Sequence, residues 1–158
     1  MEPTIELEFV GEEIPSRATE LSYFLYLYKA TYATILEKFG DLPVEKVIES
    51  YEGIAKDAAF VLEDAQKANR ISSSFFSDLG ERDLFVAKIQ KESPLLITLV
   101  AFGGVALIAA IIAGGEIELG AFGVKVKAKF NRLGDGIGAL RDALQGKPRV
   151  PKKPKRRQ

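Results

Sequence analysis

The sequence predicts an α+β protein with one transmembrane helix. A small β-α-α-β N-terminal domain comes first, and a β-hairpin and a short amphipathic helix follow the membrane segment. This fold class follows from an uncharged apolar run in mid-chain, alternating segments on both sides of it, and a split of charge between the halves. We expect an acidic α+β domain at 1–92, the transmembrane helix at 93–115, hairpin and helix at 116–146, and a disordered polybasic tail at 147–158.

The apolar run, Ser93–Gly115, holds no charged residue, although 28% of the chain is charged. Of the 19 residues from Leu95 to Ala113, 11 are Leu, Ile, Val or Phe. A helix of that length reaches about 28 Å, close to the thickness of the hydrocarbon core of a bilayer. Two alternatives stay open. The first is a helix buried in a protein core, because such a helix can also be apolar all round. The second is a re-entrant hairpin broken at Gly103–Gly104.

The N-terminal region shows both strand and helix periods. Residues 5–10 and 84–90 alternate apolar and polar side chains, which is typical of half-buried strands. We expect these two strands to pair, with Lys88 facing Glu6 and Glu8. Between them, apolar residues recur at three- and four-residue steps in two helices, one ending at Gly40 and one opening at Asp41–Pro43.

Aromatic residues off the apolar stripe leave a functional role open in this region. Tyr28 and Tyr32 fall on the stripe of the first helix and are expected to pack in the core. Tyr23 and Tyr26 fall off it, and a tyrosine ring with a polar tip suits a ligand or interface platform. The connection 69–83 has no sustained period, but it contains Phe75–Phe76, so we expect part of it to pack down.

A β-hairpin is predicted for 116–130, because charge and hydrophobicity select the same pairing. Folding at 120–123 places Glu118 opposite Lys125, Glu116 opposite Lys127, and Ile117 opposite Val126. Next, Leu133, Ile137, Leu140 and Leu144 mark a short amphipathic helix, with Asp135 as a candidate cap and Gly146 as the stop. The glycines of LGDGIGALR lack the spacing of a phosphate-binding loop.

Composition excludes several kinds of chemistry. The chain has no cysteine and no histidine, which removes thiol chemistry, the commonest general base and the commonest metal ligand. The acids lie mostly on polar faces, in no arrangement that catalysis requires. We therefore expect a protein that is not an enzyme, with no catalytic residues, no cofactor and no metal site.

Small residues in the apolar run suggest self-association. Residues of this kind at every fourth position let helix backbones approach closely in a membrane. With no charged or strongly polar residue in the run, a single copy offers no selective ion path. We therefore expect a homo-oligomer. The predicted helix–helix contacts are Ala106, Ala110 and Gly114 on one stripe, and Ala109 and Ala113 on its neighbour.

Charge is divided unevenly along the chain. Residues 1–93 carry 10 basic and 18 acidic side chains, and residues 94–158 carry 12 basic and 4 acidic ones. The tail holds seven basic residues in twelve positions, and near a membrane each is attracted to anionic lipid headgroups. The predicted lipid contacts are Lys147, Arg149, Lys152, Lys153, Lys155, Arg156 and Arg157. Nucleic acid is the less favoured partner, because the tail lacks interleaved aromatic residues.

The leading functional hypothesis is a single-pass membrane protein, either a non-enzymatic sensor or adaptor or an oligomerising membrane effector. Its partners would be the lipid bilayer, anionic headgroups, further copies and a protein recognised by the N-terminal domain. Basic residues after the run place the C-terminus in the cytoplasm, at the inner membrane if the host is bacterial. The alternative is a soluble binding module that buries the apolar helix in its core and uses the basic tail on nucleic acid.

Overall fold

The chain folds around one mixed sheet with helices on one face. The computed structural model describes residues 4–71, 75–101, 103–119, 126–147 and 155–156. The strands are β1 (Thr4–Phe9), β2 (Phe85–Gln90), β3 (Leu95–Val100), β4 (Glu116–Leu119), β5 (Val126–Phe130) and β6 (Lys155–Arg156). The helices of the described residues are α1 (Ala18–Phe39), α2 (Val44–Glu49), α3 (Tyr51–Lys67), α5 (Gly103–Ile112) and α6 (Leu133–Leu144), with a short 3-10 helix, η1 (Gly80–Arg82).

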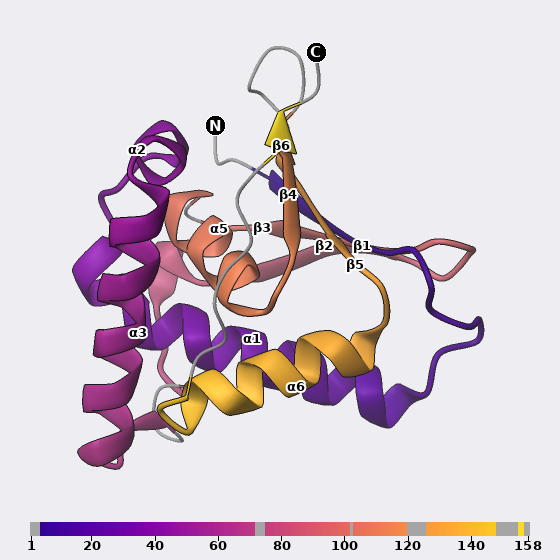
Figure 1. Cartoon of the computed structure of the whole chain (residues 1–158). Coiled ribbons are helices and arrows are strands. Elements are labelled where there is room, and N and C mark those ends of the chain that lie inside the picture. The colour runs from indigo at the N-terminus through magenta and orange to yellow at the C-terminus, as the bar shows by residue number, and fades with distance from the viewer. Residues whose placement is uncertain (1–3, 72–74, 102, 120–125, 148–154, 157–158) are drawn as a thin grey trace.

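The sheet has the strand order β2-β3-β1-β5-β4-β6, so the first strand of the chain lies in its middle. β1 is antiparallel to β3 and parallel to β5, and β4 is antiparallel to β5. In Figure 1, α1 and α6 run together along one side of the sheet, while α2 and α3 stand at one end. The acidic and basic parts of the chain therefore contribute strands to a single sheet.

The inner face of the sheet forms the core together with the helices. Alternate residues of β1 and β3 are fully buried there, as the strand period requires. Phe9 stacks on Phe130 with 4.9 Å between ring centroids, and Phe24 of α1 meets Phe9 edge-on at 5.2 Å. A Cβ at Gly136 would lie 2.6 Å from the Phe24 ring, so the glycine lets α6 approach α1 closely.

The apolar run is not a transmembrane helix, and the expected fold class is wrong in this central element. The run divides into β3, the turn around Ala101, and α5, which has only 10 residues. Within the part of the chain that the structure describes, no helix is both long and apolar enough to cross a membrane. α5 is apolar all round because the sheet and the other helices surround it, so the expectation of a helix buried in the core is the one that holds for this segment.

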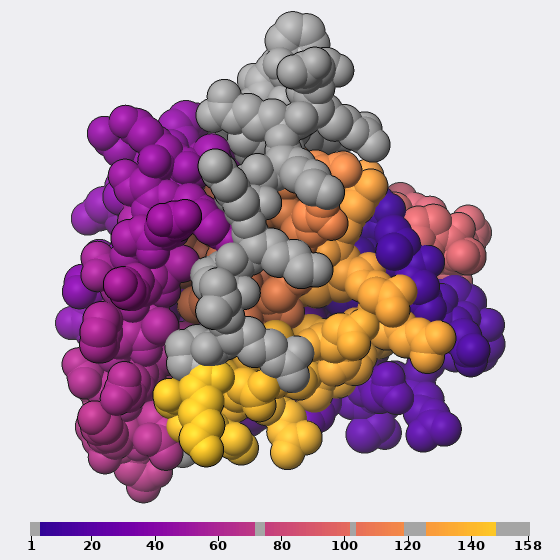
Figure 2. All heavy atoms as spheres, in the orientation of Figure 1, coloured from indigo at the N-terminus to yellow at the C-terminus, as the bar shows by residue number. Residues whose placement is uncertain are grey.

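The packing of α5 explains its glycine and alanine content. A Cβ at Gly104 would overlap the carbonyl oxygen of Leu42, which lies against the start of the helix. Tyr28 of α1 donates a hydrogen bond to the carbonyl oxygen of Ala106 at 2.6 Å. Burial, and then the neighbouring Tyr32, raises the pKa of Tyr28 well above its ordinary value, so the hydroxyl keeps its proton. Figure 2 shows α2, α3 and α6 closing around the segment that holds α5 and β4.

The outer face of the sheet carries columns of opposite charge. β1 presents Glu6 and Glu8, which pair in register with Lys127 and Lys129 of the neighbouring strand β5. The Lys127 ammonium lies 2.9 Å from a Glu8 carboxylate oxygen, and Lys129 lies 3.0 Å from Glu118 of β4. Opposite charges on neighbouring strands stabilise this strand order, each pair by about 0.2–1 kcal/mol.

The expected strand pairings need correction. β2 pairs with β3 and not with β1, so Lys88 lies opposite Thr98. The hairpin of β4 and β5 exists, but its register differs by two residues from the expected one: Glu116 pairs with Lys129 and Glu118 with Lys127. A two-residue shift keeps every side chain on its face, so the charge pattern alone could not distinguish the two registers.

The first long amphipathic helix is confirmed, and the second is present as two shorter helices. α1 ends at Gly40, where an added Cβ would overlap the guanidinium group of Arg82. The second expected helix is divided at Ser50 into α2 and α3. α6 forms as expected, but it begins at Leu133 with Arg132 at the N-cap, so Asp135 is not the cap residue. Asp135 is the third residue of the helix, and its side chain accepts a hydrogen bond from the Arg132 backbone amide at 3.1 Å.

Candidate functional site

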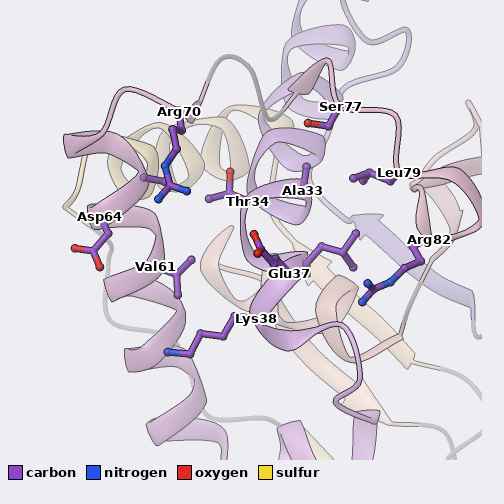
Figure 3. Close-up of a pocket in the computed structure, with 12 residues that line it drawn as sticks. Ala33, Thr34, Glu37, Lys38, Val61, Asp64, Arg70, Ser77, Leu79 and Arg82 are labelled. Atoms are coloured by element: carbon purple, nitrogen blue, oxygen red, sulfur yellow. The ribbon is translucent and has the colours of Figure 1, made fainter.

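A large hollow in the described part of the chain lies between α1, α3 and the segment that connects α3 to β2 (Figure 3). We call it the α1–α3 groove, and its volume is about 850 Å³. It is lined by Ala33, Thr34, Leu36, Glu37, Lys38, Val61, Asp64, Ala65, Arg70, Ser77, Leu79 and Arg82. Its lining is mixed, with charged groups from three separate parts of the sequence.

Local backbone chemistry brings Arg70 to the groove. α3 ends because Asn69 takes a left-handed conformation, with φ of 57°, which asparagine adopts more readily than most residues. The Arg70 amide then donates back to the Ala65 carbonyl oxygen at 2.9 Å, closing the helix end. This reversal turns the chain along α1, so Arg70 forms one end of the groove.

Two contacts to α1 hold the other end of the connecting segment. Lys29 and Asp83 form an ion pair in which the side chains are only 14% and 26% exposed. One turn further along α1, the Tyr32 hydroxyl donates to the Arg82 carbonyl oxygen at 2.6 Å. The Arg82 side chain lies against Gly40 at the carboxyl end of α1, where a cation is favoured by the helix dipole.

Charged and hydroxyl groups face each other across the groove. Figure 3 shows Arg70 and Arg82 reaching in from opposite sides, with Thr34 and Glu37 between them, while Asp64 points away. Thr34 already donates its hydroxyl hydrogen to the Ala30 carbonyl oxygen at 2.6 Å, so its oxygen can only accept a further hydrogen bond. Guanidinium groups therefore lie at the ends of the groove, and hydroxyl and carboxylate oxygens lie in its middle.

Asp83 holds the connecting segment, which forms one wall of the groove, against α1 through its ion pair with Lys29. Burial alone raises its pKa, but the hydrogen bond from Lys29, the Leu84 amide and the Lys29 charge together hold the pKa below its ordinary value. A carboxylate with a depressed pKa in the folded state stabilises that state above the unfolded pKa. The stabilisation is lost as the pH falls through the folded pKa.

We predict that Asp83→Asn lowers the free energy of unfolding by about 1–2 kcal/mol at pH 7. Urea unfolding of the wild type and the variant should converge as the pH falls through the lowered pKa of Asp83 in the folded state, because the carboxyl group is then protonated in the folded wild type too. Asp57→Asn on the exposed side of α3 is the control and should show no such difference. A penalty for Asp83→Asn that persists in acid would contradict the assigned role of the charge.

A second hollow, of about 440 Å³, lies at the other end of α1 beside the start of α6. Two of the four carboxylates that line it already have structural roles. Glu12 accepts a hydrogen bond from the Leu133 amide at 2.8 Å, and Asp135 accepts from Arg132. Among the described residues no group of His, Cys, Asp or Glu could hold a metal ion.

The structure does not place the residues expected to mediate helix association on any surface suited to it. Ala106, Ala109, Ala110 and Ala113 are all buried within the chain's own core. Gly114 is exposed with φ of 86°, a conformation that suits glycine at the end of α5. These small residues do allow close approach of backbones, but the neighbours that approach α5 are α1, α2 and α3 of the same chain.

The expected lipid-contact residues lie largely beyond the described part of the chain. Lys147 is exposed after α6, and Arg149, Lys152, Lys153 and Arg157 fall outside the described residues. Lys155 and Arg156 form β6, which pairs in parallel with Glu118 and Leu119 of β4, where a disordered tail was expected.

No sequence pattern singled out Arg70 or Arg82, because both lie in a segment without a period. The weak signals were Asn69, a residue suited to a helix end, and the apolar Phe75–Phe76 in a polar connection. No family model, no curated protein and no solved structure matches the chain. The case for function therefore rests on the residues and their geometry.

Proposed function

We propose that the protein is a binding module whose α1–α3 groove holds a small organic anion carrying a carboxylate or a phosphate ester. The observation that carries the proposal is the approach of Arg70 and Arg82 from opposite sides of one hollow. The planar guanidinium fork matches both carboxylate and phosphate oxygens. A volume of about 850 Å³ is within the range of small-molecule sites.

Glu37 further limits the chemical class of ligand that the groove can bind. A carboxylate between two guanidinium groups would repel a simple dianion, but it accepts hydrogen bonds from N–H donors. A ligand that carries an anionic group together with N–H donors satisfies both kinds of group in the groove. Nucleotides and free amino acids or short peptides share this chemistry, so the two sources need separate experimental arms.

Ligand-induced thermal stabilisation tests the groove. One arm uses mononucleotides and the other uses amino acids and dipeptides, with isothermal titration calorimetry on any compound that raises the melting temperature. We expect binding in one arm, weakened about tenfold or more by Arg70→Gln, since a charged hydrogen bond is worth 1.5–3 kcal/mol. Arg141→Gln, on the exposed side of α6, is the matched control and should bind like the wild type.

Two outcomes would count against the groove. The first is equal binding by the wild type and the Arg70→Gln variant. The second is no binding in either arm while Arg70→Gln unfolds in urea like the wild type. Glu37→Gln provides a further check, because it should weaken ligands with N–H donors more than ligands without them.

The basic C-terminal segment supports a second candidate function, binding to the phosphates of nucleic acid. The segment 147–158 holds seven Lys and Arg side chains in twelve positions. The burial of the apolar run in the core does not explain these charges. Neutralising phosphates releases counterions, so the affinity should fall steeply with salt.

The test compares two triple variants that remove the same charge. Lys152→Gln, Lys153→Gln and Lys155→Gln together should reduce duplex DNA affinity and flatten its salt dependence by about 0.9 in slope per lost contact. Lys46→Gln, Lys56→Gln and Lys67→Gln, on the exposed surface of α2 and α3, should leave the salt dependence unchanged. Equal effects of the two triples in fluorescence anisotropy would indicate non-specific attraction only.

A further inference from the structure

Four aromatic rings form a continuous strip along the outer side of α1. Tyr23 and Tyr26 have ring centroids 6.4 Å apart, Tyr26 lies 4.3 Å from Phe75, and Phe75 lies 4.9 Å from Phe76. The two ends of this aromatic strip are open to solvent: Tyr23 is 40% exposed and Phe76 is 76% exposed. The middle rings, Tyr26 and Phe75, are half-buried and hold the strip in place.

The core does not require the exposed ends of the strip. Tyr26 is two residues from Phe24, so the two side chains lie about 200° apart around α1. Phe24 faces Phe9 and α6, which places the strip on the opposite side of the helix. Exposed aromatic side chains held next to each other by packed ones are typical of recognition surfaces.

Charge near the strip decides between classes of partner. Glu20 lies one helical turn before Tyr23, and Asp78 and Glu81 follow Phe76 closely, both of them exposed. Lys29, one turn after Tyr26, is already paired with Asp83. These three carboxylates lie within five residues of a ring in the sequence, so they disfavour nucleic-acid phosphates and favour a partner with apolar contacts and basic flanks.

From this juxtaposition we infer that the aromatic strip binds the proline-rich C-terminal segment of a second copy of the chain. The sequence places Pro148, Pro151 and Pro154 at every third position. A polyproline II helix has three residues per turn, so these prolines would share one edge, with Arg149, Lys152 and Lys155 on the next. Aromatic surfaces recognise such helices because little conformational entropy is lost on binding.

The dimensions and charges of the two surfaces are complementary. Successive prolines in a polyproline II helix are about 9 Å apart, which corresponds to about two ring spacings along the strip. The basic edge of the segment would face Glu20, Asp78 and Glu81. The chain's excess of acid before residue 94 and of base after it gives the same complementarity on the larger scale.

A second copy is a better source of the segment than the same chain. α6 lies on the side of α1 opposite to the strip, and its end at Gly146 lies beside Glu63 of α3. The segment's own Lys155 and Arg156 pair with β4 at the edge of the sheet. In docking on a second copy, the C-terminal segment would therefore leave the β4 edge of its own chain and bind the aromatic strip of another chain.

The test titrates a fluorescent peptide of residues 146–158 with the full chain and measures anisotropy. We expect saturable binding that weakens about tenfold in Phe76→Ala or Tyr23→Ala, since each removes a ring from the contact. Phe60→Ala, which removes a 58% exposed ring on α3, is the matched control and should bind like the wild type. A peptide of the same composition with its prolines out of the three-residue spacing should bind more weakly.

Analytical ultracentrifugation of the full chain tests the source of the segment. Self-association should rise with concentration in the wild type and in Phe60→Ala, and it should be reduced in Phe76→Ala. Equal peptide affinity for the wild type and Phe76→Ala, or for the native and permuted peptides, would overturn the inference. So would a strictly monomeric chain, or a single-stranded oligonucleotide whose binding depends on Phe76.

Discussion

Ile97→Lys is expected to abolish the fold, whereas Leu96→Lys at the neighbouring position leaves it intact. Ile97 is fully buried on the inner face of β3, and an unpaired charge there costs about 5 kcal/mol or more, comparable with the whole stability of a small domain. Leu96 points to the outer face and pairs in register with Glu8, so a lysine there gains an opposite charge. Circular dichroism and urea unfolding of the two variants measure the difference.

This pair of variants also tests the structure of the apolar run. Adjacent residues of a strand point to opposite faces, so the two substitutions should differ greatly. In a membrane-spanning helix, a lysine at either position would meet the same hydrocarbon. Similar behaviour of the two variants would contradict the assignment of β3.

Gly104→Ala is expected to lower the free energy of unfolding by about 1–3 kcal/mol, while Gly53→Ala raises it by about 0.5–1 kcal/mol. At Gly104 the added methyl group would overlap the carbonyl oxygen of Leu42, a backbone atom that can yield only if the start of α5 moves. At Gly53, in the interior of α3, nothing lies within 4 Å of the new Cβ, and alanine is the better helix former.

The opposite signs make the comparison sharp, because both variants replace a glycine of a helix by alanine. Their urea midpoints should move in opposite directions from that of the wild type. A stabilising Gly104→Ala would show that α5 does not pack closely against the loop before α2. A destabilising Gly53→Ala would show that α3 is not exposed at that position.

Periodicity predicted the elements that have one buried face. α1 and α6 appear where apolar residues recur at helical steps, and β1 appears where acidic and apolar residues alternate. The groove was not predicted, because its two arginines lie in a connection without a period. Their position depends on Asn69, Asp83 and Tyr32, and these contacts join residues up to 54 positions apart.

The same reasoning failed where a segment is buried on every side. In residues 95–113 apolar side chains would cover every face of a strand or of a helix. No period therefore distinguishes a single membrane helix from β3 followed by α5. The charge pattern of the hairpin failed for a related reason. Glu116 and Glu118 can pair with any two successive lysines among Lys125, Lys127 and Lys129, and all such registers keep the same faces.

Local sequence settles which residues of this protein are buried in α1, β1 and α6, because each has a polar face and an apolar face with a clear period. Only the tertiary structure settles the fate of Ser93–Gly115. Its side chains are stable both in lipid and in a protein core. The location of the run therefore depends on whether the rest of the chain can surround these side chains. Here β1 pairs with both β3 and β5, and the helices cover the remaining sides. The neighbours of the run, rather than its own composition, determine where it lies.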